Sequence, residues 1–263
     1  MTSARPSEQD IDSSTPHPAR IYDCLLGGDH HFPADRAVAD RLPAVARLGA
    51  RANRAFMRRA TAWVAGTGID QFLDIGSGIP TEPNLHRVAQ GVDPRCRVVY
   101  ADYDPMVLRY AEELLAGTPE GRTEFVRADV REPAAILERA RAVLDLDRPV
   151  ALSLIALLHF VPDSDDPYGL VRALLDALAP GSCLVLSHLT MDLFTPEEDR
   201  TADYRSSGID LRPRTHAEVS RFFDGLDLVP PGLVTGWHRD ARPPADAESE
   251  GARTAWSGVG FLR

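Results

Sequence analysis

The sequence predicts a doubly wound α/β fold with a mostly parallel, seven-stranded sheet. Short apolar runs alternate with helical patterns from residue 69 onward, which is the arrangement of consecutive β-α-β units. Three of these runs also end at or lead into an acidic residue. Acids should therefore gather at one edge of the sheet, where folds of this kind bind ligands.

The individual elements follow from apolar spacing, prolines and glycines. The run 149–154 is apolar apart from Ser153, as expected of a central parallel strand, and Thr215 with Glu218 forms a capping box at a helix start. The last two strands have no helix between them, so they could pair antiparallel at the sheet edge. The expected strands are 69–75, 97–101, 123–127, 149–154, 183–187, 226–237 and 256–262. The expected helices are 35–48, 53–64, 82–90, 105–117, 133–142, 166–178, 196–205 and 215–224.

The first strand runs into the turn Gly76-Ser77-Gly78, where a ligand must come close to the backbone. A pyrophosphate would use bare N–H groups at a helix N-terminus, whereas a cationic amino-acid ligand would use the carboxylate of Asp74. The dinucleotide fingerprint needs a third glycine at the position of Thr81. The turn therefore favours a nucleoside with an amino-acid tail, S-adenosylmethionine (SAM), over NAD.

Two further acids follow later strands. Asp102 ends a β-rich run 24 residues after Gly78, the spacing of a second strand, and its carboxylate can accept both ribose hydroxyls. Asp129 follows the third strand, where an adenine amino group could be read. The alternative is that Asp102 and Asp129 only cap the helices that follow.

Composition excludes several classes of protein and site. The net charge of −10 disfavours nonspecific nucleic-acid binding, so no nucleic-acid partner is expected. Cys24, Cys96 and Cys183 lack the spacing of a disulfide framework or a zinc site, and no metal site is expected. Because there is no apolar signal region and no uninterrupted apolar stretch of about 18 residues, we expect a cytoplasmic protein without membrane contact.

Residues 69–190 resemble a class I SAM-dependent methyltransferase, and residues 19–263 resemble a narrower bacterial family, S-adenosyl methyltransferase family 19. The matching motifs are Arg20-Ile-Tyr-Asp-Cys-Leu-Leu-Gly-Gly, Phe72-Leu-Asp-Ile-Gly-Ser-Gly-Ile-Pro-Thr, Asn84-Leu-His-Arg-Val-Ala-Gln, Val98-Val-Tyr-Ala-Asp-Tyr-Asp-Pro, Leu158-His-Phe-Val-Pro-Asp and Pro180-Gly-Ser-Cys-Leu-Val-Leu-Ser-His. The resemblance implies a Rossmann-like fold with SAM as cofactor. We expect a disordered tail over 1–18, an N-terminal helical lid over 19–66 and a SAM-binding methyltransferase domain over 67–263.

The resemblance also implies where the cofactor is held. The glycine turn would hold its methionine end, the acid after the second strand its ribose, and the residues after the third strand its adenine. The segment after the fourth strand would pass under the sulfonium, and residues 20–28 would cover the site. The residues assigned to cofactor binding are Tyr22, Asp74, Gly76, Ser77, Gly78, Asp102, Tyr103, Asp129, Val130 and Ala156.

Methyl transfer from a sulfonium is an in-line displacement, in which the protein mainly positions the acceptor and excludes water. A general base is needed only when the acceptor must lose a proton. His159 and His188 follow the fourth and fifth strands, at the ligand edge, and are the candidate catalytic residues. The alternative is that each donates a hydrogen bond to a loop carbonyl.

Three functions compete. Transfer to an oxygen or nitrogen of a small-molecule acceptor is favoured, because the sequence lacks the Asp/Asn-Pro-Pro-Tyr/Phe motif of amino-group methyltransferases and a cysteine placed for cytosine methylation. A non-catalytic SAM-binding sensor or partner module would share the cofactor site. A nicotinamide oxidoreductase would need the missing glycine. A second cavity beside the sulfonium would separate the first two functions.

Overall fold

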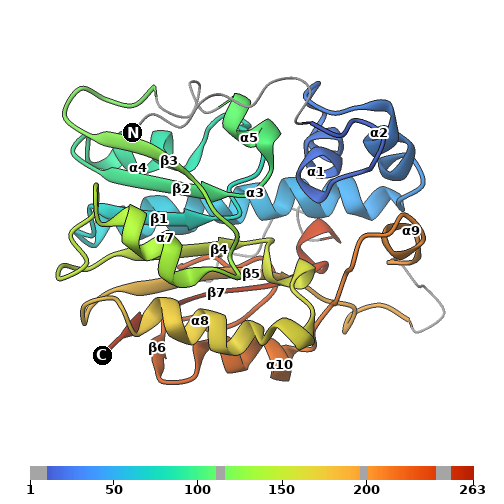
Figure 1. Ribbon diagram of the computed structural model, residues 1–263. Helices are drawn as coiled ribbons and strands as arrows, with labels where there is room; N and C mark the ends of the chain where they lie inside the picture. The colour runs from blue at the N-terminus through green and yellow to red at the C-terminus, as the bar shows by residue number, and fades with distance from the viewer. Residues whose placement is uncertain (1–10, 111–115, 196–200, 241–249) are drawn as a thin grey trace.

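The computed structural model has a central sheet with helices on both faces and a helical N-terminal segment at one end (Figure 1). It describes residues 11–110, 116–195, 201–240 and 250–263. Within these residues the sheet has seven strands in the spatial order β3-β2-β1-β4-β5-β7-β6. The strands are β1 Gln71–Ile75, β2 Arg97–Asp102, β3 Arg122–Arg127, β4 Ala151–Ile155, β5 Cys183–Leu189, β6 Leu226–Leu228 and β7 Ala255–Leu262.

Strands β1 to β5 are parallel, and β7 is antiparallel to both β5 and β6. The predicted doubly wound, mostly parallel sheet and the predicted antiparallel pair at its edge are therefore confirmed. The α-helices are α1 Pro18–Leu26, α2 Pro33–Ala39, α3 Ala44–Gly66, α4 Leu85–Val92, α5 Pro105–Arg109, α7 Pro133–Ala140, α8 Pro167–Leu175, α9 Ala202–Ser206 and α10 His216–Ser220. Short 3₁₀ turns are η2 Leu158–Phe160, η3 Asp163–Asp165 and η4 Arg221–Phe223.

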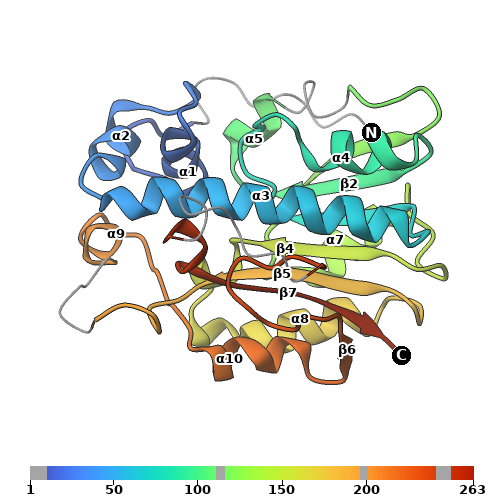
Figure 2. The ribbon, with the colours of Figure 1, turned by 180° about the vertical axis from the view of Figure 1, so that it is seen from behind.

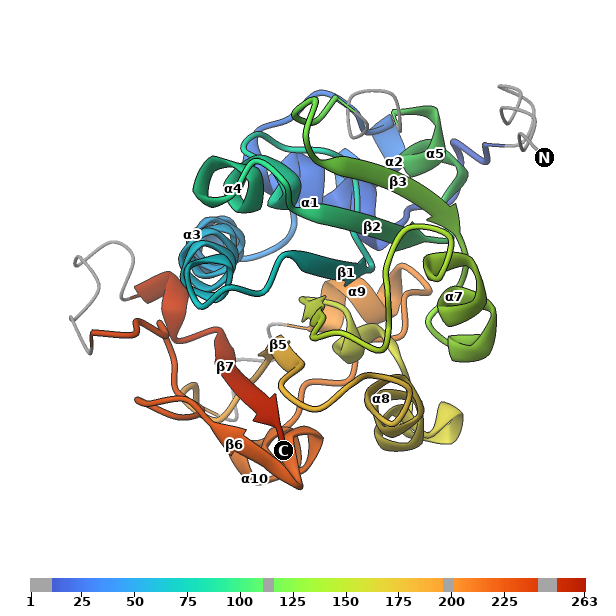
Figure 3. The same ribbon diagram turned by 90° about the vertical axis from the view of Figure 1, so that its left-hand side faces the viewer.

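Alternation along the strands divides the core between the two faces of the sheet. In β1, Phe72 packs with the α3 side chains, whereas Leu73 and Ile75 pack with those of α7 and α8. Seen from behind, α3 runs along one face for most of its length (Figure 2). Seen along the sheet, α3 and α4 lie on one side and α7 and α8 on the other (Figure 3). Both faces are buried, which explains why β4 is apolar apart from Ser153.

The N-terminal segment forms a cluster of its own. Ile21 and Leu25 of α1 pack against Val38 of α2 and Ala50 of α3. Helix α1 ends at Gly27, whose φ of +87° suits a residue without a side chain. In Figure 1, α1 and α2 lie with α9 beyond one end of the sheet, so they are placed to cover its ligand edge.

The largest differences from the expected boundaries concern two helices, one strand and the tail. The two helices expected over 35–48 and 53–64 are replaced by α2 and the long α3, because Pro43 separates α2 from α3 and Gly49 continues α3. A side chain at Gly49 would come within 2.6 Å of Thr254, which explains the small residue. The strand expected over 226–237 ends at Leu228, ahead of the turn-forming Pro230-Pro231-Gly232.

The fourth difference concerns the tail. His17 caps α1, and the carbonyl of Asp12 accepts a hydrogen bond from Arg20, so residues 12–18 are part of the folded structure. The expected helices over 105–117 and 196–205, the tail and the loop 239–252 each fall partly outside the described residues. Among the described residues, no helix is long and apolar enough to span a membrane.

Candidate active site

Two cavities adjoin at the carboxyl ends of the parallel strands. The polar cavity lies over the ends of β1, β2, β3 and β4, and all the residues predicted to bind the cofactor line it. The apolar cavity lies between α1, α3, the end of β5 and α9, and its lining includes His159 and His188. The residues that line both cavities are Pro18, Tyr22, Asn53, Ala156 and Phe160.

The glycine turn after β1 forms the floor of the polar cavity. Gly76 and Gly78 have φ values of +74° and +65°, and a side chain at Gly76 would lie 2.6 Å from Leu157. Ser77 lies between them, and its buried hydroxyl has no hydrogen-bond partner in the described part of the chain. The turn thus presents backbone and an unpaired hydroxyl to the polar cavity.

Asp74 is a buried carboxylate that accepts no hydrogen bond from the described residues. Burial raises the pKa of Asp74 to about 7; the charge of Arg54 lowers it and that of Asp102 raises it further. Arg54 lines the same cavity and donates to the carbonyls of Thr81 and Pro83, which follow the glycine turn. A carboxylate and a guanidinium in one cavity suit the ammonium and carboxylate groups of an amino acid.

The acid at the end of β2 is held by backbone donors. Asp102 accepts the N–H of Gly78 at 2.8 Å and that of Asp104 at 3.0 Å, which leaves lone pairs for a ligand. Burial raises the pKa of Asp102. The side chain of Asp104, rather than that of Asp102, caps α5 through Met106. The alternative that Asp102 is only a helix cap is therefore wrong.

The residues expected at the adenine end line one side of the polar cavity. Tyr103 is 47% exposed, and its hydroxyl lies 2.8 Å from Nε2 of His17. Asp129 accepts the backbone N–H and the guanidinium of Arg131, whereas the N-cap of α7 is Glu132. Asp129 is thus not the cap of that helix either.

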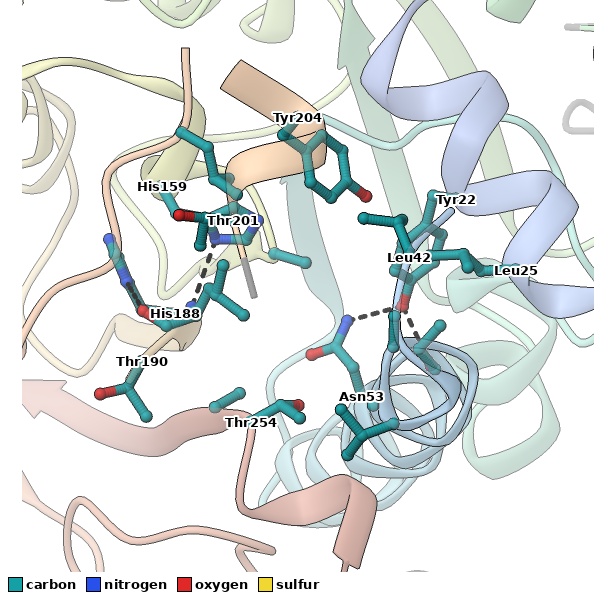
Figure 4. A pocket seen from close by; sticks show the side chains of 18 of the residues that line it. Tyr22, Leu25, Leu42, Asn53, His159, His188, Thr190, Thr201, Tyr204 and Thr254 are labelled. Atoms are coloured by element: carbon teal, nitrogen blue, oxygen red, sulfur yellow. Dashed lines mark hydrogen bonds between the residues drawn. The ribbon is translucent and has the colours of Figure 1, made fainter. Parts of the chain in front are cut away.

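A directed chain of hydrogen bonds stands where the two cavities meet. The N–H of Ala156 donates to Oγ of Ser187 at 3.0 Å, and that hydroxyl donates to Oδ1 of Asn53. The Nδ2 group of Asn53 donates to the Tyr22 hydroxyl at 2.9 Å, which donates to the carbonyl of Ala50 (Figure 4). The chain ties the ends of β4 and β5 to α3 and α1. Ala156 has a φ of +56°, a strained value for a residue other than glycine.

The two candidate catalytic histidines differ in orientation. His188 donates from Nδ1 to the Leu189 carbonyl at 2.8 Å, and its Nε2 accepts from Arg214 at 3.0 Å. Figure 4 shows this ring turned away from the apolar cavity. Nδ1 of His159 accepts the Leu189 N–H at 3.3 Å, and its other ring nitrogen turns toward the open centre of that cavity (Figure 4).

Both imidazoles are neutral in this setting. Burial lowers the pKa of His159 well below its ordinary value, and the charges of His188 and Arg214 lower it further. Burial also lowers the pKa of His188 to about 3, against the opposing effect of the Leu189 carbonyl. Because Nδ1 of neutral His159 is an acceptor, its proton resides on Nε2.

Helix α1 is fastened to the loop after β2. Asp104 is buried and lies 2.9 Å from Nδ1 of His17 and 3.3 Å from Nε of Arg20. Although burial raises the pKa of Asp104, the hydrogen bond and charge of His17 and the charge of Arg20 hold it below its ordinary value. These contacts keep α1 over the polar cavity.

Sequence reasoning missed Arg54, Asn53 and His17. The first two fall inside the helix expected over 53–64, and nothing in their spacing identifies the turn of α3 that meets the sheet edge. His86 is buried against Tyr100, and Asn84 is the N-cap residue of α4, with a side chain that accepts the Thr81 N–H and donates to Glu82. No group of three or more metal-binding side chains occurs in the described ranges.

The polar cavity fits SAM. It offers an unpartnered carboxylate beside a guanidinium, a glycine turn with an orphaned hydroxyl, and a second carboxylate on the next strand. With the strand order of the sheet, this site defines a class I SAM-dependent methyltransferase. A model of the S-adenosyl methyltransferase family matches residues 4–263, so the chain belongs to that family. The predicted cofactor, SAM, is confirmed.

Solved structures agree with this membership. A DUF574 family protein from Streptomyces avermitilis is 45% identical, with a TM-score of 0.90 over 96% of this chain and 100% of that one. A candidate methyltransferase from Thermobifida fusca is 38% identical, with a TM-score of 0.88 over 99% and 100%. The magnesium protoporphyrin IX methyltransferase of Synechocystis, with bound S-adenosylhomocysteine (SAH), shares the fold at 13% identity, with a TM-score of 0.54 over 92% and 93%. The curated proteins contain no match to this chain.

Proposed function

We propose that this methyltransferase transfers the SAM methyl group to an oxygen or nitrogen of a small molecule bound in the apolar cavity. The observation that carries the proposal is the wall shared by the two cavities, formed by Tyr22, Asn53, Ala156 and Phe160 among others. An acceptor on one side of this wall would lie beside a cofactor on the other.

The residues of the polar cavity suggest how SAM is held. Asp74 would bind the ammonium group and Arg54 the carboxylate, while the glycine turn and Ser77 would contact the same end. Asp102 would accept the ribose hydroxyls. Tyr103, Asp129 and Val130 line the part of the cavity left for adenine. SAM, when bound, supplies a methyl group on a positively charged sulfur.

The wall residues would set the approach of the acceptor. The Tyr22 hydroxyl accepts from Asn53 and donates its proton to the Ala50 carbonyl. It therefore has no proton left to donate to either ligand and would contact them mainly through its ring. A wall held by hydrogen bonds would keep water from the cofactor and hold the acceptor in line, which is the main contribution of the protein to such a transfer.

The two histidines would have different roles. Both ring nitrogens of His188 are engaged, so we propose that it is structural and keeps the end of β5 against Arg214. His159 turns toward the apolar cavity and is the histidine that can touch the acceptor. This arrangement corresponds to the loop-carbonyl alternative for His188 and leaves His159 as a candidate site residue.

A non-catalytic SAM-binding module would need no acceptor site. The loops after β4 and β5 enclose the apolar cavity beside the polar one, which favours an enzyme with an acceptor. The test incubates the purified protein with methyl-labelled SAM and a bacterial extract separated into small molecules and macromolecules. We expect label in a small-molecule product. Label only in the macromolecules would contradict the proposed acceptor class, and no label with SAM binding intact would support the non-catalytic module.

A further inference from the structure

The described lining of the apolar cavity contains no Asp, Glu, Lys or Arg side chain. Its surface comes largely from aliphatic and aromatic side chains of the N-terminal helices and of the loops after β4 and β5. They include Leu25, Leu42, Val45, Phe160, Met191 and Leu211. A charged group brought here would lose its hydration without gaining an ion pair, which is costly. The cavity therefore discriminates against phosphorylated and carboxylated ligands.

The histidines do not supply the missing charge. Burial lowers the pKa of both His159 and His188, so each is neutral at pH 7. Arg214 carries the nearest charge to this pair, but it is buried and donates to His188, Leu158, Val161 and Asp163. The Arg214 guanidinium is thus held by these partners and does not line the apolar cavity.

The polar contacts open to a ligand are few. Oγ1 of Thr190 accepts from Asp192, and that of Thr254 donates to Gly251. Nε2 of His159 has no hydrogen-bond partner in the described part of the chain, and it carries the ring proton because Nδ1 accepts from Leu189. The Tyr204 hydroxyl likewise has no hydrogen-bond partner among the described residues, and Figure 4 shows it directed across the cavity toward Tyr22 and Leu42.

We propose that the acceptor is an uncharged, mainly apolar molecule and that His159 positions it by donating a hydrogen bond from Nε2 to one of its oxygen or nitrogen atoms. This inference rests on the proposed function, because it assigns the apolar cavity to the acceptor. It gives His159 the role of a donor rather than that of the general base expected from the sequence, since Nε2 holds a proton and has no lone pair in this tautomer.

The test measures binding to the SAH-saturated protein by calorimetry, with 1-naphthol, naphthalene and 1-naphthoate as probes. They share one ring system and differ in hydroxyl and charge. We expect 1-naphthol to bind at least tenfold more tightly than 1-naphthoate, and several-fold more tightly than naphthalene. Equal or tighter binding of 1-naphthoate, or no binding of 1-naphthol, would overturn the proposal. Because no methyl transfer is measured, failed turnover with intact binding would count only against the proposed function.

Three variants locate the binding. Ala46→Phe should fill the apolar cavity and abolish 1-naphthol binding, whereas Ala44→Phe, the same change at an exposed position of α3, should not. His159→Phe should bind 1-naphthol no better than naphthalene. Retained SAH binding shows that each variant is folded. If His159→Phe does not bind SAH, Tyr204→Phe is measured in its place. Wild-type discrimination between 1-naphthol and naphthalene in Tyr204→Phe then assigns the preference to His159, and loss of that discrimination contradicts the assignment.

Discussion

At the scale of single residues, the active site is built from polar groups that the rest of the protein leaves unsatisfied. Within the described residues, the buried Asp74 accepts no hydrogen bond and the Ser77 hydroxyl has no partner, whereas Asp102 and Asp104 nearby are well bonded. A buried, unpartnered carboxylate destabilises the folded protein. Its presence at the cavity floor is explained by a cationic ligand that restores the missing interaction.

The first prediction is that SAM affinity depends on pH through Asp74. The pKa of its carboxyl is raised to about 7 by burial, so the carboxyl is protonated below pH 7 and cannot pair with an ammonium group. SAM affinity should fall up to about tenfold for each pH unit below 7 and level off above pH 8. Calorimetry from pH 5.5 to 8.5 at constant ionic strength measures this. Asp74→Asn should bind weakly with no such slope; an equal slope in the variant would assign the titration to another group.

The same group makes an opposite prediction for stability. A carboxyl whose pKa is raised in the folded state binds its proton more tightly there, so stability should fall as pH rises from about 4 to 7. At pH 8, Asp74→Asn should therefore be more stable than the wild type by up to about 4 kcal/mol, and the two should converge near pH 4. Denaturant titrations at both values measure the difference. A variant less stable at pH 8 would show that the carboxylate is paired.

Sequence reasoning predicted that three acids lie at the ligand edge, because each stands at or near the end of a strand that its apolar pattern identifies. Asp74, Asp102 and Asp129 all line the polar cavity for this reason. Arg54 and Asn53 could not be found in the same way. They lie on a long helix whose outer face is also polar, and only the packing of α3 across the sheet shows which turn meets the ligand edge.

At the scale of elements, α1 is fastened over the polar cavity because three of its polar residues bond in three directions. Arg20 pairs with Asp104 after β2, Tyr22 joins the hydrogen-bond chain at the wall, and Asp23 accepts from His30 and His31 in the turn that follows. A side chain at Gly28 would collide with Asp23, which accounts for the second glycine of the motif. The motif at residues 20–28 thus contains both the side chains that attach α1 and the glycines that end it.

A third prediction tests this attachment. Asp104→Asn keeps an oxygen for the N–H of Met106 but loses the charge that binds His17 and Arg20. If the lid closes over the cofactor, SAM affinity should fall about 10- to 100-fold, mainly through faster dissociation. Stopped-flow binding measures both rates. The matched control is Asp40→Asn, which removes a surface ion pair of the same segment with Arg47 and should change neither rate. Unchanged dissociation in Asp104→Asn would mean that α1 is not a lid for SAM.

The boundaries of the helices and of the tail were harder to predict from the sequence than the presence of the elements. The expected break in α3 reflects Gly49, but this glycine is required by the close approach of Thr254 from a segment about 200 residues away in sequence. The tail boundary at residue 18 followed composition, which gives no sign that His17 meets Tyr103 and Asp104. Both errors come from tertiary contacts that override local preference.

At the scale of the whole molecule, the residues of the hydrophobic cores and the residues of the site occupy different parts of the sheet. The strands and their flanking helices form two buried cores, while Asp74, Ser77 and Arg54 gather at one edge beneath the N-terminal segment. The order β3-β2-β1-β4-β5-β7-β6 places β4 between β1 and β5, so the end of β1 lines the polar cavity, the end of β5 lines the apolar cavity, and Ala156 after β4 lines both. The account therefore depends on one geometric claim, that the cofactor and the acceptor meet at the shared wall.

A crystal structure of the protein with SAH tests this claim most directly. The account predicts that the amino group lies within hydrogen-bond distance of Asp74, that the ribose contacts Asp102, and that the sulfur faces the wall formed by Tyr22, Asn53 and Ala156, with the apolar cavity behind it. A sulfur atom that faces away from this wall, or SAH bound outside the polar cavity, would contradict the account.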